Sequence, residues 1–182
     1  MARVPSIDPA AVAPEHRDLL ARPIALHRAL VNSPGALRAF AALGEYIRHG
    51  STLDPRLREL AILQVGYLAR APYEWSHHIK IGHEFGVTDD DIRGLIAETE
   101  GGTSALDPFM RTVLRAAREI AERGAVTDAT WDVLAGVLRP ELLVDLVVTI
   151  SFYCGVVRVL ASLHIEVEDD YMPYLHQFPL PP

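Results

Sequence analysis

Cysteine is nearly absent from this chain, because its 182 residues include only Cys154. A single cysteine excludes an internal disulfide bond and any zinc cluster built on several thiolates. The sequence also lacks a cluster of lysine and arginine residues, and its net charge is −7 with a pI near 5.6. This charge balance argues against nucleic acid and anionic membranes as main partners.

The sequence has no segment typical of secretion or membrane insertion. Residues 1–18 lack a basic stretch followed by an apolar one, so we expect no signal peptide. The longest apolar run, residues 142–163, is interrupted by Asp145 and Arg158 and is typical of a core helix rather than a membrane span. We therefore predict a soluble, cytoplasmic protein.

Motifs that mark common catalytic sites are also missing. There is no Gly-x-Ser-x-Gly nucleophile motif and no glycine-rich loop ahead of a helix. The spacing of Glu74 and His77 matches one half of a di-iron helical bundle, but the second Glu-x-x-His is absent. We therefore expect neither a metal nor another cofactor.

Helical periodicity is present in almost every segment. Capping residues mark several helix starts, as at Ser33, Asp54 and Thr88, and Gly86 is suited to follow the end of a helix. No segment alternates polar and apolar residues as a half-buried strand does. We predict an all-α, single-domain bundle of about seven helices over residues 15–166, preceded by an extended arm at 1–14 and followed by an irregular tail at 167–182.

The densest group of ionisable side chains lies in residues 72–86, PYEWSHHIKIGHEFG. In a helix, Glu74 and His78 share one face with the apolar Ile81 and Phe85, so we expect both to point inward or into a pocket. His77 lies off this face. His83, further round the helix, is expected to be solvated.

The preceding helix carries a similar carboxylate, because Glu59 shares a face with Ile62 and Leu63. Apolar neighbours raise the pKa of a carboxylate, and a nearby imidazole lowers it again. Glu59, Glu74 and His78 on two facing helices would form a proton-transfer set. The ordinary alternative is a surface or half-buried contact between Glu74 and His78, with Glu59 exposed at a rim.

Residues 53–95 resemble the carboxymuconolactone decarboxylase superfamily, which also contains the alkylhydroperoxidase D (AhpD)-like peroxidases. The peroxidase branch has a glutamate, a cysteine twelve positions later, a second cysteine three further on, and a histidine four after that. Here these positions are Glu59, Ala71, Glu74 and His78, so both cysteines are replaced. The letters YEWSHH at 73–78 are close to the Tyr-Glu-Trp-x-x-His pattern of the decarboxylase-like branch.

The resemblance implies an AhpD-like helical fold that assembles as a homo-oligomer, either a trimer, a hexamer or a dimer. It also implies a site between the Glu59 helix and the Glu74 helix, often near a subunit boundary. Without a Cys-x-x-Cys pair, no thiolate can reduce a peroxide and no second thiol can re-form a disulfide. Peroxidase activity is therefore disfavoured, and Cys154 is expected to be an inert core thiol.

The resemblance further implies a cofactor-free lyase or isomerase acting on a small acidic lactone or unsaturated metabolite, with lactone decarboxylation as the named reaction. In this hypothesis His78 is the general acid or base, Glu74 orients it or carries the proton, and Glu59 is a second acid or base. A non-catalytic helical oligomer that binds a small molecule, or has a regulatory role, is the alternative. A residual redox protein is a third hypothesis.

The same resemblance assigns substrate contacts. Tyr73 and Trp75 would be walls of the substrate site, and His77 would donate a hydrogen bond to the substrate. No anchor for a substrate carboxylate can be assigned from the sequence. The candidates are Arg56, Arg58 and Arg158.

Overall fold

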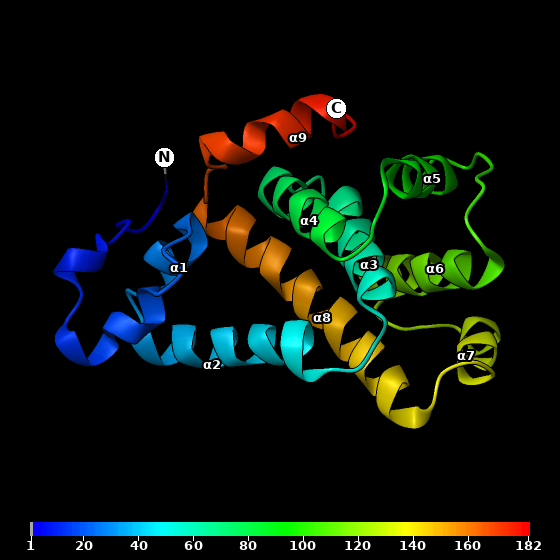
Figure 1. Cartoon of the computed structure of the whole chain (residues 1–182), viewed down its shortest axis with the longest axis horizontal. Coiled ribbons are helices and arrows are strands. Elements are labelled where there is room, and N and C mark those ends of the chain that lie inside the picture. The colour runs from blue at the N-terminus through cyan, green and yellow to red at the C-terminus, as the bar shows by residue number, and fades with distance from the viewer. Residues whose placement is uncertain (1) are drawn as a thin grey trace.

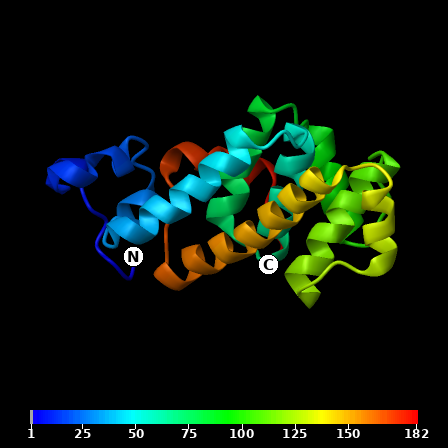
Figure 2. The ribbon, with the colours of Figure 1, turned by 90° about the horizontal axis from the view of Figure 1, so that it is seen from below.

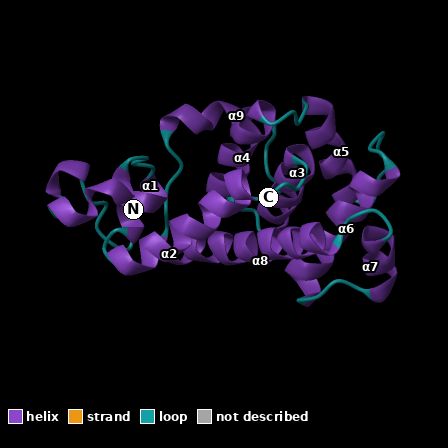
Figure 3. Ribbon diagram, turned by 60° about the horizontal axis from the view of Figure 1, so that its bottom comes forward, coloured by secondary structure: helices purple, strands orange, loops and turns teal. Residues whose placement is uncertain are grey.

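The computed structural model describes residues 2–182, and in this part of the chain every regular element is helical (Figure 3). Residues 2–182 form nine α-helices and one π-helical turn, where the sequence predicts about seven helices. In chain order they are α1 (Ala25–Leu30), α2 (Pro34–Glu45), the π-helical turn η3 (Tyr46–Gly50), α3 (Pro55–Leu68), α4 (Pro72–Glu84), α5 (Asp89–Thr99), α6 (Pro108–Arg123), α7 (Asp128–Ala135), α8 (Pro140–Leu163) and α9 (Met172–Gln177).

The helix starts follow the capping signals of the sequence. The carboxylate of Asp54 accepts a hydrogen bond from the backbone N–H of Leu57, and Thr88 and Asp91 form a reciprocal capping box at the start of α5. Gly86 has a φ of +90°, the left-handed conformation expected after a helix end. Ser33 precedes α2 as predicted, but its side chain makes no capping hydrogen bond.

Helix α3 lies at the centre of the molecule and packs against α4, α6 and α8 (Figure 1). Every residue from 58 to 67 is buried, including the charged Arg58 and Glu59. A helix buried on all sides needs partners for its polar side chains, because an unpaired buried charge is costly. The polar residues of α3 are therefore held in specific contacts, and two of them belong to the candidate site.

Helix α8 is long and apolar enough to cross a membrane by length and composition, but 44% of its most apolar window is buried inside the protein. It runs diagonally through the fold and packs against α3, α6 and α7 (Figure 1). Its buried Asp145 accepts hydrogen bonds from Tyr46 Oη (2.9 Å) and Ser51 Oγ (2.5 Å). These contacts are those of a core helix, as the sequence indicates. The cytoplasmic location stays a prediction.

Both ends of the chain are more ordered than the sequence predicts. The predicted extended arm contains a 3₁₀ turn at Pro9–Ala11, and a second 3₁₀ segment, Pro14–Leu20, precedes α1. Seen from below, these N-terminal elements form one end of the molecule and α5, α6 and α7 the other (Figure 2). The predicted irregular tail contains another 3₁₀ turn, Asp169–Tyr171, and α9.

Helix α9 forms because tertiary contacts hold it, since its own six residues are too few for a stable isolated helix. It packs against α4, and the buried Phe178 just after it belongs to the same apolar cluster as Trp75. The indole Nε1–H of Trp75 donates a hydrogen bond of 2.8 Å to the carbonyl of Phe178. The tail is thus fixed to the bundle through a residue of α4.

We expect Trp75→Phe to lower the free energy of unfolding by about 1–3 kcal/mol, because it removes this buried hydrogen bond and part of the ring volume. The control is Glu84→Gln, an exposed residue on the same helix, which should change stability by less than about 0.5 kcal/mol. Urea unfolding followed by circular dichroism measures both. Equal effects of the two substitutions would contradict the role assigned to Trp75.

Candidate active site

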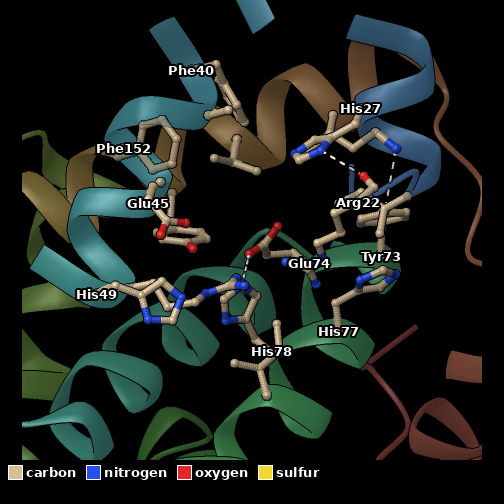
Figure 4. Close-up of a pocket in the computed structure, with 18 residues that line it drawn as sticks. Arg22, His27, Phe40, Glu45, His49, Tyr73, Glu74, His77, His78 and Phe152 are labelled. Carbon is tan, nitrogen blue, oxygen red and sulfur yellow. Dashed lines mark hydrogen bonds and ion pairs between the residues drawn. The ribbon is translucent and has the colours of Figure 1, made fainter. Parts of the chain in front are cut away.

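A cavity of about 310 Å³ lies where the N-terminal helices meet α4 and α8 (Figure 4). Its walls come from five parts of the chain: the segment around α1, helix α2, the turn η3, helix α4 and helix α8. The residues that line it are Arg22, Ile24, Leu26, His27, Phe40, Ala41, Gly44, Glu45, Arg48, His49, Tyr73, Glu74, His77, His78, Ile81, Phe152, Tyr153 and Val156.

The three predicted proton-transfer residues lie together, with Glu74 and His78 at the wall of this cavity and Glu59 behind them. His78 Nδ1 lies 2.7 Å from Glu59 Oε2 across the α3–α4 contact, and His78 Nε2 lies 3.0 Å from Glu74 Oε1 on its own helix. All three side chains are buried. The structure thus replaces the surface-contact alternative with a buried relay, Glu59–His78–Glu74, in which both imidazole nitrogens face a carboxylate.

The close packing of α3 on α4 brings these side chains together. A side chain at Gly82 would meet Val87 at 3.2 Å, and Glu59 Cβ lies 3.7 Å from the same point. On α3, a Cβ at Gly66 would lie 3.6 Å from Glu74 Cγ. Each glycine therefore faces a carboxylate-bearing residue of the opposite helix. Their small size lets Glu59 reach His78 directly.

Arg58 forms the far end of the relay, away from the cavity. Its Nε donates a hydrogen bond of 2.9 Å to Glu59 Oε1, and its Nη1 donates one of 3.1 Å to the carbonyl of Arg48. The guanidinium also lies over the ring of Phe85, 4.6 Å from its centroid. Positive and negative groups therefore alternate from Arg58 through Glu59 and His78 to Glu74.

This alternation sets the pKa values in the relay. Burial by itself lowers the pKa of His78, but the charges of Glu74 and Glu59 and their hydrogen bonds outweigh it and raise the pKa to about 9. Burial also acts to raise the pKa of Glu59, yet the charge of His78, its hydrogen bond and Arg58 together lower it. At neutral pH the relay therefore holds an imidazolium next to an ionised Glu59.

Glu74 is the last member of the relay, and it lines the cavity together with His78. Its side chain is buried, and its Oε1 pairs with His78 Nε2 at 3.0 Å. No hydrogen bond within the described chain uses the second oxygen of Glu74, so this oxygen is the one that can contact a ligand. In Figure 4 the Glu74 side chain points toward the open space of the cavity above His78.

Tyr73 and His77 form a second polar group on the same helix. His77 Nε2 lies 2.8 Å from Glu168 Oε2, and the hydroxyl of Tyr73 donates to Glu168 Oε1 at 3.2 Å. The ring of His77 is stacked between Tyr73 (4.0 Å) and Tyr171 (3.5 Å). Burial lowers the pKa of His77 against the opposing effect of Glu168, whose own pKa is lowered to about 2, mainly by the hydrogen bond from His77, although burial opposes this.

The predicted substrate walls divide between the cavity and the core. Tyr73 and His77 line the cavity, so their predicted contact with a substrate stays a prediction. Trp75 does not: its side chain is fully buried in the apolar cluster behind α4, and its N–H is used by Phe178. The prediction of Trp75 as a wall is wrong, because one residue along a helix turns a side chain by about 100°.

The three predicted carboxylate anchors also lie elsewhere. Arg56 binds Asp91, Arg58 lies behind Glu59, and Arg158 contacts the carbonyl of Cys154 beside a second hollow. The arginines that do reach the cavity, Arg22 and Arg48, come from a turn and from η3. No spacing in the sequence marks them, because they approach the site from segments far from α4.

Among residues 2–182, no group of three histidine, cysteine, aspartate or glutamate side chains is arranged to hold a metal ion. Of the two carboxylates that flank His78, Glu59 pairs with both His78 and Arg58, and Glu74 pairs with His78. The arrangement is chemically suited to holding and moving a proton at the cavity wall.

The geometry thus defines a helical protein of AhpD-like fold that has a buried Glu–His–Glu relay. The profile of the carboxymuconolactone decarboxylase family matches residues 34–122, which run from α2 through most of α6. The matched residues are just under half of the chain and include the motif that carries the resemblance, so the chain is similar to this family over α2 to α6. A search of curated proteins found no match.

Solved structures share the fold at low sequence identity. An uncharacterised peroxidase-related protein from Ralstonia eutropha JMP134, described as an alkylhydroperoxidase AhpD core, is 17% identical with a TM-score of 0.80, covering 96% of this chain and 95% of that one. A peroxidase-related protein from Silicibacter sp. TM1040 is 16% identical with a TM-score of 0.73 and coverages of 94% and 97%. A cysteine-to-alanine variant of the debrominase Bmp8, in complex with 2,3,4-tribromopyrrole, is 18% identical with a TM-score of 0.72 and coverages of 82% and 80%.

We expect His78 to titrate with a pKa near 9, well above its ordinary value of 6.5, and Glu59→Gln to lower this pKa by removing one of the two carboxylates. Nuclear magnetic resonance of the imidazole measures both. Because the folded pKa is higher than the unfolded one, His78 stabilises the fold fully below about pH 6.5, and this stabilisation is lost as the pH rises through about 9. A His78 that titrates near 6.5 would contradict the relay.

Proposed function

We propose that this protein is a cofactor-free lyase or isomerase that delivers a proton to a small, acidic, unsaturated substrate, with decarboxylation of a carboxylated muconolactone as the specific reaction. One observation carries the proposal. The buried relay Glu59–His78–Glu74 ends at the wall of a ligand-sized cavity, on the carboxylate of Glu74.

The proposed reaction is balanced without a cofactor. The bond between the substrate carbon and its carboxylate breaks, carbon dioxide leaves, and the electron pair enters the conjugated system as an extended enolate. The proton on His78 Nε2 passes to the ionised carboxylate of Glu74, and Glu74 passes it on to a carbon of this enolate. Water restores the proton to His78 after the product leaves.

The raised pKa of His78 suits it to this role as a proton store. Because the pKa is about 9, the imidazole holds its proton at neutral pH, and Glu59 stabilises that charge from the opposite nitrogen. Arg58 keeps Glu59 ionised in turn, since its guanidinium binds the remaining carboxylate oxygen. Glu59 and Arg58 would therefore act by holding and tuning His78 rather than by touching the substrate.

The redox chemistry of related folds is less consistent with this chain. The positions of the two peroxidase cysteines hold Ala71 and Glu74, and Cys154 lies beside the other hollow, where burial raises the pKa of its thiol. The debrominase Bmp8 variant binds a small halogenated ring, which supports a small cyclic ligand on this fold. Thiol-dependent consumption of hydrogen peroxide that is lost in Cys154→Ser would favour the redox alternative.

We expect Glu74→Gln to lower kcat for 4-carboxymuconolactone by at least about 100-fold, because the amide cannot pass a proton to carbon. Carbon dioxide release and the ultraviolet absorbance of the product measure the rate. The matched control is Glu84→Gln, an exposed glutamate at the end of the same helix, which should keep the rate within about threefold. The wild-type rate should fall as the pH rises through about 9, where His78 loses its proton.

Two results would contradict this proposal. The first is a folded Glu74→Gln variant with the wild-type rate. The second is a wild-type protein that neither releases carbon dioxide from 4-carboxymuconolactone nor exchanges carbon-bound hydrogen of muconolactone with deuterium oxide. In the second case, binding of these lactones without turnover would favour the non-catalytic, ligand-binding alternative.

We also propose that the protein is a homo-oligomer that associates through α7 and the start of α8. Among residues 2–182, four of the six exposed large hydrophobic side chains fall in this short part of the chain: Trp131, Val133, Val137 and Val144. Val137 and Val144 are about 60% exposed, with values of 62% and 59%. Exposed apolar side chains gathered in one region favour an interface between subunits.

We expect the double substitution Val137→Glu and Val144→Glu to convert the oligomer to a monomer of 20.1 kDa, because it places charges in an apolar contact. Sedimentation velocity measures the mass, and circular dichroism checks the fold. Thr103→Glu, in an exposed loop, is the control and should leave the mass unchanged. A wild-type monomer, or a double variant with the wild-type mass, would contradict this interface.

A further inference from the structure

We infer that Arg48 binds the anionic group of the ligand that enters the cavity, and that this ligand is a small unsaturated carboxylate. The inference deepens the proposed function and rests on it for the unsaturated character of the ligand. The anion itself is argued from the cavity wall. Arg48 lines the cavity together with Glu74 and His78, and it forms no ion pair with any carboxylate of residues 2–182.

Arg48 shares the cavity with two carboxylates but forms an ion pair with neither of them. Glu45 and Glu74 line it, so an entering anion is repelled from their side and is favoured only beside a positive group. Arg22, the other arginine of the lining, belongs to an exposed turn before α1, and its carbonyl is held by His27. Arg48 is the more buried of the two, which strengthens its interaction with an anion.

The backbone that carries Arg48 is held in place from three directions. It belongs to the π-helical turn η3, a geometry that is rare and often found at functional sites. Asp145 of α8 binds the Tyr46 hydroxyl at one end of the turn and the Ser51 hydroxyl just beyond the other. Arg58 of α3 donates to the carbonyl of Arg48 itself, at 3.1 Å. These contacts fix the position of the backbone from which the Arg48 side chain extends.

Arg58 also joins this anchor to the proton relay. The same guanidinium donates through Nη1 to the carbonyl of Arg48 and through Nε to Glu59, which binds His78. Tyr153 adds a second link, because its ring lies edge-on to His78, with the ring centroids 4.9 Å apart. Arg48 also acts to lower the pKa of the Tyr153 hydroxyl, against the effect of burial. An anion held by Arg48 is therefore positioned relative to the proton on the relay.

The guanidinium and the size of the cavity define the class of ligand. A planar guanidinium matches a carboxylate, which it can bind through two parallel hydrogen bonds. A cavity of about 310 Å³ is at the small end of the range for ligand sites, so it fits a molecule of one ring or a short conjugated chain. We therefore assign the site to a small, flat carboxylate.

The test uses sorbate (2,4-hexadienoate) and sorbamide, two flat six-carbon molecules that differ in charge. Isothermal titration calorimetry on the full chain should show sorbate binding at least about 10-fold more tightly than sorbamide. We expect Arg48→Gln to weaken the affinity for sorbate by about 10- to 100-fold, because the charge-assisted hydrogen bonds are lost. The affinity for sorbamide should change by less than about threefold. Arg48→Lys should retain part of the preference for sorbate.

The matched control is Arg158→Gln, which removes an exposed arginine beside the other hollow and should leave both affinities unchanged. The inference is overturned if the wild-type protein binds sorbate no better than sorbamide or binds neither. It is equally overturned if the folded Arg48→Gln variant keeps the preference, or if Arg158→Gln abolishes it to the same extent.

A further variant separates this inference from the proposed function. Glu74→Gln should bind sorbate at least as tightly as the wild type, because it removes a negative charge from the cavity. A sorbate preference without any turnover of lactones would contradict the proposed reaction and leave the anchor intact. Lactone turnover without a sorbate preference would contradict the anchor alone.

Discussion

The rest of this structure depends on four buried charges that alternate in sign: Arg58, Glu59, His78 and Glu74. Each would be costly to bury alone, and removing one partner of such a group leaves an unpaired charge that costs about 3–5 kcal/mol. The network is therefore stable only if α3 and α4 hold their register closely. The glycines at the contact, the capped start of α3 and the fixed position of Trp75 all serve that register.

The same network couples stability to chemistry. The attraction that holds the two helices together is what keeps a proton on His78 at neutral pH, so the proton store cannot be weakened without weakening the α3–α4 contact. Within residues 2–182, Glu74 pairs only with His78, whereas Glu59 pairs with both His78 and Arg58. A ligand that donates a hydrogen bond to the second oxygen of Glu74 completes the network.

The cavity needs elements that take no part in the relay. Glu168, from the segment before α9, accepts hydrogen bonds from the backbone of Ala25 at the start of α1 and from Tyr73 on α4, and it pairs with His77. The C-terminal segment thereby holds α1 against α4 and completes one wall. Asp145 does the same for η3 from α8. Sequence-distant carboxylates thus close the cavity from two sides.

The sequence alone predicts the all-helical class, the main helix boundaries, the resemblance to the decarboxylase family and the inward direction of Glu59, Glu74 and His78. These follow from helical periodicity, capping residues and motif spacing, which are local along the chain. It also predicted Trp75 as a wall and the tail as irregular, and both were wrong for one reason. Neither the side of α4 that faces the cavity nor the contact of Phe178 with Trp75 can be read from local spacing.

Packing in three dimensions sets which arginine reaches the cavity and which carboxylates are shared between helices. Arg48, Asp145 and Glu168 stand in segments that are 26 to 94 positions from Glu74, and each is brought to its place by packing rather than by periodicity. The sequence fixes which side of a helix is polar. The partner that a buried polar group finds there depends on three-dimensional packing, because every buried charge must be matched by a specific neighbour.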